Sequence, residues 1–225
     1  MGFRDDVDAT IANEVTMFLR TVPYASHLTG EGRLNEAYYL RHRIETIKRI
    51  RLTARLDALA LAQFIVMDYE AARTWARYAC TELDHDRLFL ADLQAHGVTA
   101  KMVADTQPFP STLRMISALE REIETTGPTA TIAYSLFVEW NSERYSALVT
   151  DKVESQFSRD HVRGSRAHLK IDDGEDHYNM ILTLAAGLGR RFGNEQILQY
   201  LREIGAFFRT YFEELYEQTS AKAVS

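Results

Sequence analysis

Three segments of the chain place histidines and carboxylates at spacings that suit metal binding. In chain order, their candidate ligands are Glu82, His85, Glu139, His168, Asp172 and His177. If the segments form three helices that face one another, they supply three imidazoles and three carboxylates to one site. Such nitrogen and oxygen ligands suit two iron or manganese ions and leave coordination positions open for O2 and a substrate. The sequence therefore predicts an oxygen-activating metalloenzyme.

The first segment, Glu82-Leu-Asp-His85, places an acid and an imidazole on one face of a predicted helix. Trp75, Tyr78 and Phe89 recur at spacings of three and four along the same stripe. A carboxylate on such an inward stripe needs a partner. The Glu-x-x-His spacing alone is weak evidence because it also arises by chance, and an ordinary surface or core pairing is the alternative.

The second segment is Glu139, which follows an uncharged stretch over 129–138 and precedes Trp140. A helix with this composition is expected to be buried around much of its circumference. Burying an unpaired carboxylate costs several kcal/mol unless a metal ion or a hydrogen-bonded cation compensates. The alternative is a glutamate at the emerging end of the helix, because residues 141–144 are polar.

The third segment places His168 and Asp172 one helical turn apart, so that both side chains can reach one metal ion. His177 lies nine positions after His168, which on a regular helix turns it to the opposite face, whereas Glu175 falls near the His168 face. Gly174 is a poor helix former, and a bulge there would bring His177 toward the metal. A solvated acidic turn is the alternative, so either His177 or Glu175 could be the last ligand.

The composition is that of an ordinary globular protein. The 225 residues, 46% hydrophobic and 26% charged, suffice for one core, so we expect a single domain over 1–225 with a frayed tail at 219–225. A net charge of −6 leaves no basic excess for phosphates, so we expect no nucleic-acid partner. Short uncharged runs and an acidic N-terminus predict no membrane partner and a cytoplasmic location. Cys80 is the only cysteine, which excludes an intrachain disulfide and a thiolate-rich zinc site.

Helical periodicity extends over most of the chain, with no convincing pair of strands. The four prolines fall where a periodic segment ends or is about to begin, and Asp68 is typical of an N-cap. The predicted helices span 6–20, 34–67, 69–96, 98–105, 111–125, 129–153, 160–187 and 194–218. The expected fold class is all-α, a compact single-domain bundle of seven or eight helices.

The order of these segments resembles that of the haem-oxygenase-like diiron oxidases and oxygenases, over about residues 35–215. That family has a seven-helix bundle and a ligand pattern of Glu-x-x-His or a longer-spaced Glu and His, then a Glu on the next core helix, then His-x-x-x-Asp-x-x-His. The matching residues here are Glu82, His85, Glu139, His168 and Asp172. The chain departs at the last ligand: the family's final histidine falls at Glu175, and His177 matches only if two residues are inserted around 173–174.

The resemblance implies that two ferrous ions per chain, or alternatively manganese ions, activate O2 to oxidise a small substrate. Glu82, Glu139 and Asp172 would then be catalytic residues as well as metal ligands. Some members of the family use a further carboxylate from the preceding helix, for which Asp57 or Glu45 could serve. Members desaturate, fragment or N-oxygenate amino acids, decarboxylate fatty acids or form rings such as azetidines. We therefore expect an amino acid or a related compound as the substrate, in a natural-product pathway.

An amino-acid substrate needs a cation that binds its carboxylate. The candidates in the sequence are Arg163, Arg166, Arg190 and Arg191. The last predicted helix is rich in aromatic residues, which either form the face of a homodimer or pack over the bundle. These aromatic residues are Phe207, Phe208, Tyr211 and Phe212.

Three alternatives compete with the metalloenzyme. The same fold resemblance extends to thiamin-salvage hydrolases, for which Cys80 would be the nucleophile, and to a metal-free quinone-cofactor oxidase. The third alternative is a helical interaction protein without chemistry. Metal content separates them, because iron favours the oxidase and a metal-free protein with a reactive Cys80 favours the hydrolase.

Overall fold

The chain folds into α-helices, as the sequence predicts. The computed structural model describes residues 2–220, except for the side chains of Asp172 and Asp173. Over this range it contains nine α-helices, one short 3-10 helix and no strand, which confirms the all-α class. The α-helices are α1 (Phe3–Thr21), α2 (Glu36–Met67), α3 (Tyr69–Ala95), α4 (Ala100–Asp105), α5 (Pro110–Thr126), α6 (Thr129–Gln156), α7 (Arg163–Glu175), α8 (His177–Phe192) and α9 (Asn194–Ser220), and the 3-10 helix η1 (Arg159–Val162) precedes α7.

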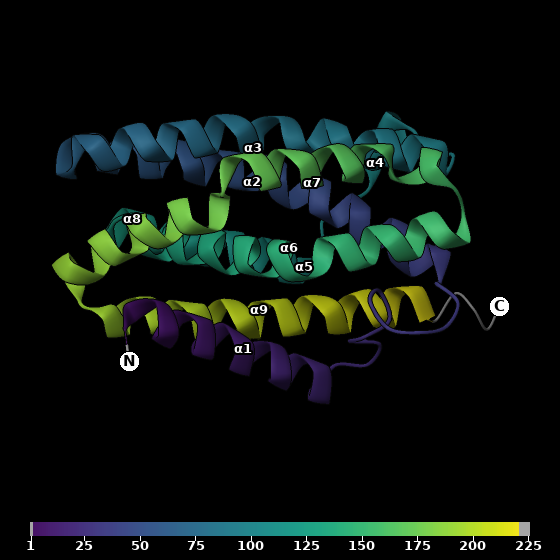
Figure 1. Ribbon diagram of the computed structural model, residues 1–225, viewed down its shortest axis with the longest axis horizontal. Coiled ribbons are helices and arrows are strands. Elements are labelled where there is room, and N and C mark those ends of the chain that lie inside the picture. The colour runs from purple at the N-terminus through teal and green to yellow at the C-terminus, as the bar shows by residue number, and fades with distance from the viewer. Residues whose placement is uncertain (1, 221–225) are drawn as a thin grey trace.

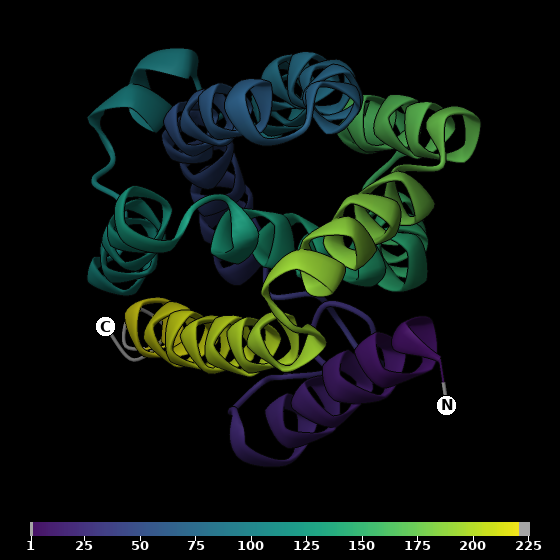
Figure 2. The ribbon, with the colours of Figure 1, turned by 90° about the vertical axis from the view of Figure 1, so that its left-hand side faces the viewer.

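The helices form three layers along the long axis of the molecule (Figure 1). α3 and α7 lie side by side in the first layer, α5, α6 and α8 in the second, and α9 and α1 in the third, as the end-on view also shows (Figure 2). α2 runs obliquely, because its first turns pack against α9 and its last turns pack along α3. The predicted site segments, on α3, α6, α7 and α8, therefore meet between the first two layers.

Asp68 ends α2 and begins α3, as predicted. Its side chain accepts the backbone N–H groups of Glu70 and Ala71, both at 3.1 Å. A cap of this kind satisfies donors of the first turn and contributes about 1 kcal/mol. Trp75 Nε1 then donates to the carbonyl oxygen of Asp57 at 2.8 Å, which joins α3 to the antiparallel α2. This pairing brings Asp57 beside the face of α3 that carries the first predicted segment.

The first nine residues of α6 are buried on all sides. Every residue from Thr129 to Phe137 is less than a tenth exposed, because α5, α8 and α9 cover this part of the helix. Its uncharged composition follows from this environment. Glu139 is only 6% exposed, so the expectation of a buried carboxylate at this point is correct. No helix in the described part of the chain, α6 included, is long and apolar enough to cross a membrane.

The aromatic residues of α9 pack within the bundle. Phe208 stacks on Tyr134 and Phe137, with ring centroids 6.3 and 5.3 Å apart. Tyr211 is buried, and Phe212 is half-buried with its ring against Tyr211. Packing over the bundle therefore explains these rings, and a homodimer stays a prediction.

The segment predicted as one helix over 160–187 is divided into η1, α7 and α8, which accounts for the additional helix. The chain turns sharply between α7 and α8 (Figure 1). The turn lies at Asp176, whose backbone is left-handed with φ 49° and ψ 50°, so the expected bulge at Gly174 is wrong. Aspartate tolerates this conformation better than most residues, and here its carboxylate accepts the Asn179 amide at 2.7 and 2.9 Å. The turn places His177 at the start of a new helix with its own direction.

Candidate metal centre

Glu82, Glu139 and His177 come together from α3, α6 and α8. One ligand atom from each residue lies within 4.8 Å of the other two. His177 Nδ1 is 3.6 Å from Glu82 Oε1 and 3.9 Å from Glu139 Oε2. Two carboxylates and one imidazole at this spacing form a group that could hold a metal ion.

Tyr78 orients Glu139 within this group. Its hydroxyl donates to Glu139 Oε1 at 2.7 Å, and its ring meets the His177 ring edge-on with centroids 5.3 Å apart. Burial, and then the negative charges of Glu139 and Glu82, hold the pKa of Tyr78 well above its usual value. Tyr78 therefore stays protonated and donates its hydrogen bond to one oxygen of Glu139, while the other oxygen faces His177.

Glu175 orients His177 from the opposite side of the ring. Glu175 Oε2 lies 2.8 Å from His177 Nε2 and also accepts the hydroxyl of Thr81 at 3.0 Å. The hydrogen bond from His177 lowers the pKa of Glu175, so this carboxylate is ionised. A histidine held in this way at one nitrogen presents the other nitrogen to a metal, an arrangement common around metal-ligating histidines. Of the two alternatives for the last ligand, the clustered residue is His177, and Glu175 contacts it.

His85 and His168 lie on the other side of Glu82. His85 Nδ1 is 3.2 Å from Glu82 Oε2, so the two oxygens of Glu82 face His85 and His177. The rings of His85 and His168 are close, with centroids 4.2 Å apart. Asp172 follows His168 by one turn of α7, but its side chain is outside the described part of the chain, so its predicted role stays a prediction.

Asp92 holds α7, and with it His168, against α3. Asp92 is fully buried, and its carboxylate accepts the N–H groups of Gly164 and Ser165 at 2.6 and 2.8 Å and the Ser165 hydroxyl at 2.6 Å. A carboxylate at the N-terminal end of a helix is stabilised by the helix dipole as well. A Cβ atom at Gly164 would collide with the carbonyl oxygen of Leu88, so only glycine permits this close approach of the two helices.

The two predicted extra carboxylates differ in their surroundings. Asp57 lines a cavity beside Glu82, and burial, followed by the charge of Glu82, raises the pKa of Asp57 to about 7. Glu45 is fully buried elsewhere, where it accepts the Phe109 N–H at 3.0 Å and the Thr112 hydroxyl at 2.7 Å and pairs with Arg41 at 2.8 Å. Asp57 therefore borders the metal centre, whereas Glu45 joins α2 to α5.

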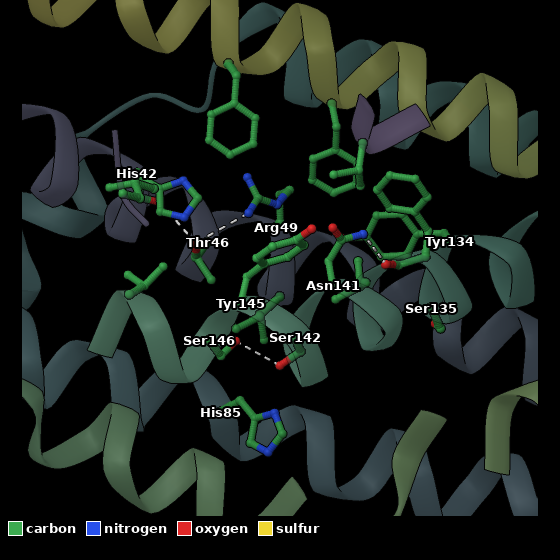
Figure 3. Close-up of a pocket in the computed structure, with 18 of the residues that line it drawn as sticks. His42, Thr46, Arg49, His85, Tyr134, Ser135, Asn141, Ser142, Tyr145 and Ser146 are labelled. Carbon is green, nitrogen blue, oxygen red and sulfur yellow. Dashed lines mark hydrogen bonds between the residues drawn. The ribbon is translucent and has the colours of Figure 1, made fainter. Parts of the chain in front are cut away.

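The cavity has a volume of about 310 Å³ and reaches the metal centre at Glu82, His85 and His168. Tyr78 also lines it, whereas Glu139 and His177 are in contact with Glu82 but are not part of the cavity lining. Figure 3 shows a polar stretch of α6 along its wall, with hydroxyl and amide side chains between His85 and the side chains of α2. These polar residues of α6 are Ser135, Asn141, Ser142, Tyr145 and Ser146. A volume of this size suits a small organic molecule.

The arginines predicted to bind a substrate carboxylate do not line this cavity. Arg163 pairs with Asp160, and Arg166 pairs with Asp151 and Glu154, in each case toward solvent. Arg190 and Arg191 are exposed in the last turn of α8. Their placement does not support the predicted role, because arginines near a site in sequence need not lie on its inward face.

Two other arginines line the cavity, and neither was predicted from the sequence. Arg43 and Arg49 are each 8% exposed and project from α2. The available signal was periodicity: Arg49, Thr53 and Leu56 follow one another at spacings of four and three on the buried stripe of α2. When this face of the helix packs against the rest of the protein, an arginine on it is buried despite its charge.

Cys80 is exposed and is absent from the residues that line the cavity. A nucleophile must reach its substrate, so this placement does not support the hydrolase alternative.

No family model matches the chain, and no curated protein matches its sequence. Three solved structures are similar to it over nearly their whole length. A domain of unknown function with a haem-oxygenase-like fold from Shewanella denitrificans has a TM-score of 0.83 and 17% identity, covering 98% of this chain and 94% of the other. A TenA homologue from Pseudomonas syringae pv. tomato has a TM-score of 0.76 and 14% identity, covering 96% and 93%. A CADD-like protein of unknown function from Nostoc punctiforme has a TM-score of 0.69 and 14% identity, covering 96% of each chain. The chain therefore has a haem-oxygenase-like fold.

Proposed function

We propose that the protein is a non-haem, iron-dependent oxidoreductase that uses O2 to cleave C–H or oxidise N–H bonds of a small amino acid or a related compound. The observation that carries this proposal is the group of Glu82, Glu139 and His177, which joins three helices beside a cavity of about 310 Å³. The second half of the site, His85 and His168, adjoins it through Glu82.

The residues fit two metal ions. Glu139 and His177 would hold one ion, His85 and His168 the other, and Glu82 lies between the two pairs with one oxygen toward each. Asp172 is proposed as a further ligand of the second ion. Two ferrous ions supply the activation of O2 when bound.

The chain's own residues prepare the site for this role. Tyr78 keeps one oxygen of Glu139 occupied, Glu175 fixes the ring of His177, and Asp92 holds α7 in place. Asp57, with its pKa raised to about 7, adds a carboxyl group that can hold or release a proton near neutral pH beside Glu82. The apolar part of the cavity wall limits the access of water to the bound substrate.

The first test is the anaerobic titration of the metal-free protein with Fe(II), followed by exposure to O2 with a panel of amino acids and fatty acids. We expect close to two irons per chain, and O2 uptake that one class of compound accelerates. Glu139→Ala and His177→Ala should lower iron binding, whereas Glu143→Ala, an exposed residue one turn further along α6, should not.

Glu175→Ala provides a graded variant in the same titration. Loss of an orienting partner typically costs 10-fold to 100-fold in metal affinity, so we expect this variant to bind iron more weakly than wild type but better than His177→Ala. Normal iron uptake in the Glu139 and His177 variants would show that these residues do not bind iron, and the proposed metal centre would be wrong.

A further inference from the structure

We infer that Arg49 binds the carboxylate of the substrate, and that the substrate is therefore a carboxylic acid anion whose body extends along α6 toward Glu82. This inference rests on the proposed function, because it names the class of molecule that enters the same cavity. Arg49 lines the cavity and is 8% exposed, and its Nη1 atom is buried without a hydrogen-bond partner. An unsatisfied cationic donor in a cavity wall is a ready binding site for an anion.

The neighbours of Arg49 do not neutralise it. Nη2 donates to the Thr46 hydroxyl at 3.3 Å, and the guanidinium carbon lies 4.6 Å from the ring centroid of Tyr211 and 5.5 Å from that of Phe208. Aromatic faces attract a cation but carry no net charge. The hydroxyls of Tyr211 and Tyr134 also lie near the guanidinium, and they are uncharged. Glu45 is the carboxylate whose charge acts on Arg49, but in the described part of the chain it forms its ion pair with Arg41 and not with Arg49. A buried charge without a counter-ion is costly, so its retention points to a ligand that supplies the missing negative charge.

Other charged residues near the cavity have partners within the chain. Arg43 donates to Ser165 Oγ at 3.1 Å and lies over the ring of Phe89 at 4.6 Å. Glu14, which also lines the cavity, is paired with Arg209. Arg49 is thus distinguished by its unused donor.

Arg49 and Asp57 fix the direction in which the substrate lies. They are eight residues apart on α2, which corresponds to about 12 Å along the helix axis. Thr53, between them, also lines the cavity. A carboxylate at Arg49 therefore leaves the rest of the molecule to run along α2 and α6 toward Asp57 and Glu82.

Figure 3 shows the side chains that line the cavity between Arg49 and His85, where the body of the substrate would lie. Tyr145, Ser142 and Ser146 lie between Arg49 and His85, and the side-chain oxygen of Asn141 faces the same space. Asn141 is held in this orientation because its amide nitrogen donates to the Phe137 carbonyl at 2.8 Å. Its oxygen is an acceptor for an ammonium group, so a free amino acid and an unsubstituted acid share the carboxylate contact and differ at Asn141.

The test measures ligand binding by calorimetry, on the full chain, both metal-free and loaded with Mn(II). The probes are L-leucine, 4-methylpentanoate and decanoate, each compared with its neutral carboxamide. We expect at least one acid to bind, and its carboxamide to bind about 10-fold to 100-fold more weakly, because it lacks the charge that the guanidinium recognises. Tighter binding of L-leucine than of 4-methylpentanoate indicates an amino-acid substrate, and the reverse indicates an unsubstituted acid.

Arg49→Met should abolish the preference for the acid over the carboxamide, and Arg49→Lys should retain part of it. Arg51→Met, which alters an exposed arginine of the same helix paired with Asp86, should leave the preference unchanged. Because Arg49→Met also removes a buried unpaired charge, we expect its melting temperature without ligand to equal or exceed that of wild type. A purely structural arginine would instead lower it.

Failure of this inference is distinguishable from failure of the proposed function. If no acid of the panel binds in either metal state, or if Arg49→Met keeps the preference for the acid, the inference is overturned while iron binding still stands. If wild type binds no metal but acids bind through Arg49, the proposed oxidase fails and the carboxylate site remains.

Discussion

Glu82 is the residue at which the two halves of the candidate site meet. Its oxygens face His85 of the same helix at 3.2 Å and His177 of α8, which is far away in sequence, at 3.6 Å. The residue types and the Glu-x-x-His spacing could be recognised in the sequence. His177, on the far side of Glu82, was one of two candidates for the last ligand, and the choice between it and Glu175 depends on a backbone turn at Asp176 that the sequence did not predict.

His42 shows how the buried charge of Arg49 affects a neighbouring residue. His42 is half-buried beside Tyr211, whose hydroxyl lies 2.7 Å from its Nδ1. Burial, followed by the positive charges of Arg49 and Arg43, lowers the pKa of His42 well below its usual 6.5. The folded chain therefore keeps His42 neutral at pH values where the unfolded chain protonates it.

The sign of the resulting pH dependence follows from proton uptake. Below pH 6.5, the unfolded chain binds a proton at this position and the folded chain does not, so His42 makes the free energy of unfolding fall as the pH falls. We expect the wild type to lose up to about 1.4 kcal/mol per pH unit more than His42→Gln between pH 6.5 and 5. Urea unfolding at a series of pH values measures this difference. Parallel pH profiles of the two proteins below pH 6.5 would contradict it, and above pH 7 the profiles should be parallel.

At the scale of the helices, local signals predicted most boundaries. Asp68 caps α3 as expected, and the uncharged run of α6 is buried as expected. Both features could be predicted because capping and helical periodicity depend on residues that are close in sequence. The division of the segment over 160–187 was missed. Gly174 is the obvious weak point in sequence, but the helix ends where Asp176 can adopt a left-handed backbone and accept the Asn179 amide.

The contact between α3 and α7 gives a test at this scale. Asp92→Ala removes three hydrogen bonds from the start of α7 and leaves their donors buried, so we expect a loss of about 2–4 kcal/mol in the free energy of unfolding. Because α7 carries His168, the iron content should also fall from about two per chain toward one, while the group of Glu82, Glu139 and His177 keeps its ion.

Chemical unfolding and iron analysis of the same samples measure both effects. Asp84→Ala is the control, because Asp84 lies on α3 but is exposed and paired with Arg87 at the surface. Gly164→Ala should reproduce the loss of iron, since a methyl group there collides with the Leu88 carbonyl. Full iron content in both the Asp92 and the Gly164 variants would show that α7 does not need this contact to hold its ligand.

At the scale of the whole molecule, the fold was predictable and the cavity was not. Helical periodicity indicated a helical bundle, the resemblance of the segment order to a known family implied a haem-oxygenase-like fold, and a similar solved structure has that fold. The cavity depends on the oblique path of α2 across the layers, which brings Arg43 and Arg49 inward (Figure 2). A charged residue on a helix is usually solvent-exposed. Periodicity could therefore indicate that Arg49 is buried, but only the tertiary packing of α2 shows that both arginines line a cavity.

The metal-free protein carries several carboxylates in a small buried volume, so metal binding should stabilise the whole fold. Burial, and then the charge of Glu82, raise the pKa of Asp57 to about 7, and Glu139 lies in one group with Glu82 and His177. Metal binding compensates these charges in the folded state alone. At a free metal concentration of 100 times Kd, the stabilisation is about 2.7 kcal/mol, which for a chain of this size corresponds to a rise of roughly 5–10 °C in melting temperature.

Glu139→Gln should change the stability of the metal-free protein and the stabilisation by metal in opposite directions. Removing one buried charge should leave the metal-free variant at least as stable as the wild type, while the rise in melting temperature caused by Mn(II) should shrink or vanish. Thermal unfolding with and without Mn(II), under conditions that exclude O2, measures both quantities on the same protein. A variant that keeps the full Mn(II)-induced rise would show that the ion binds elsewhere, and a variant that is less stable without metal would show that Glu139 is held by Tyr78 for structural reasons alone.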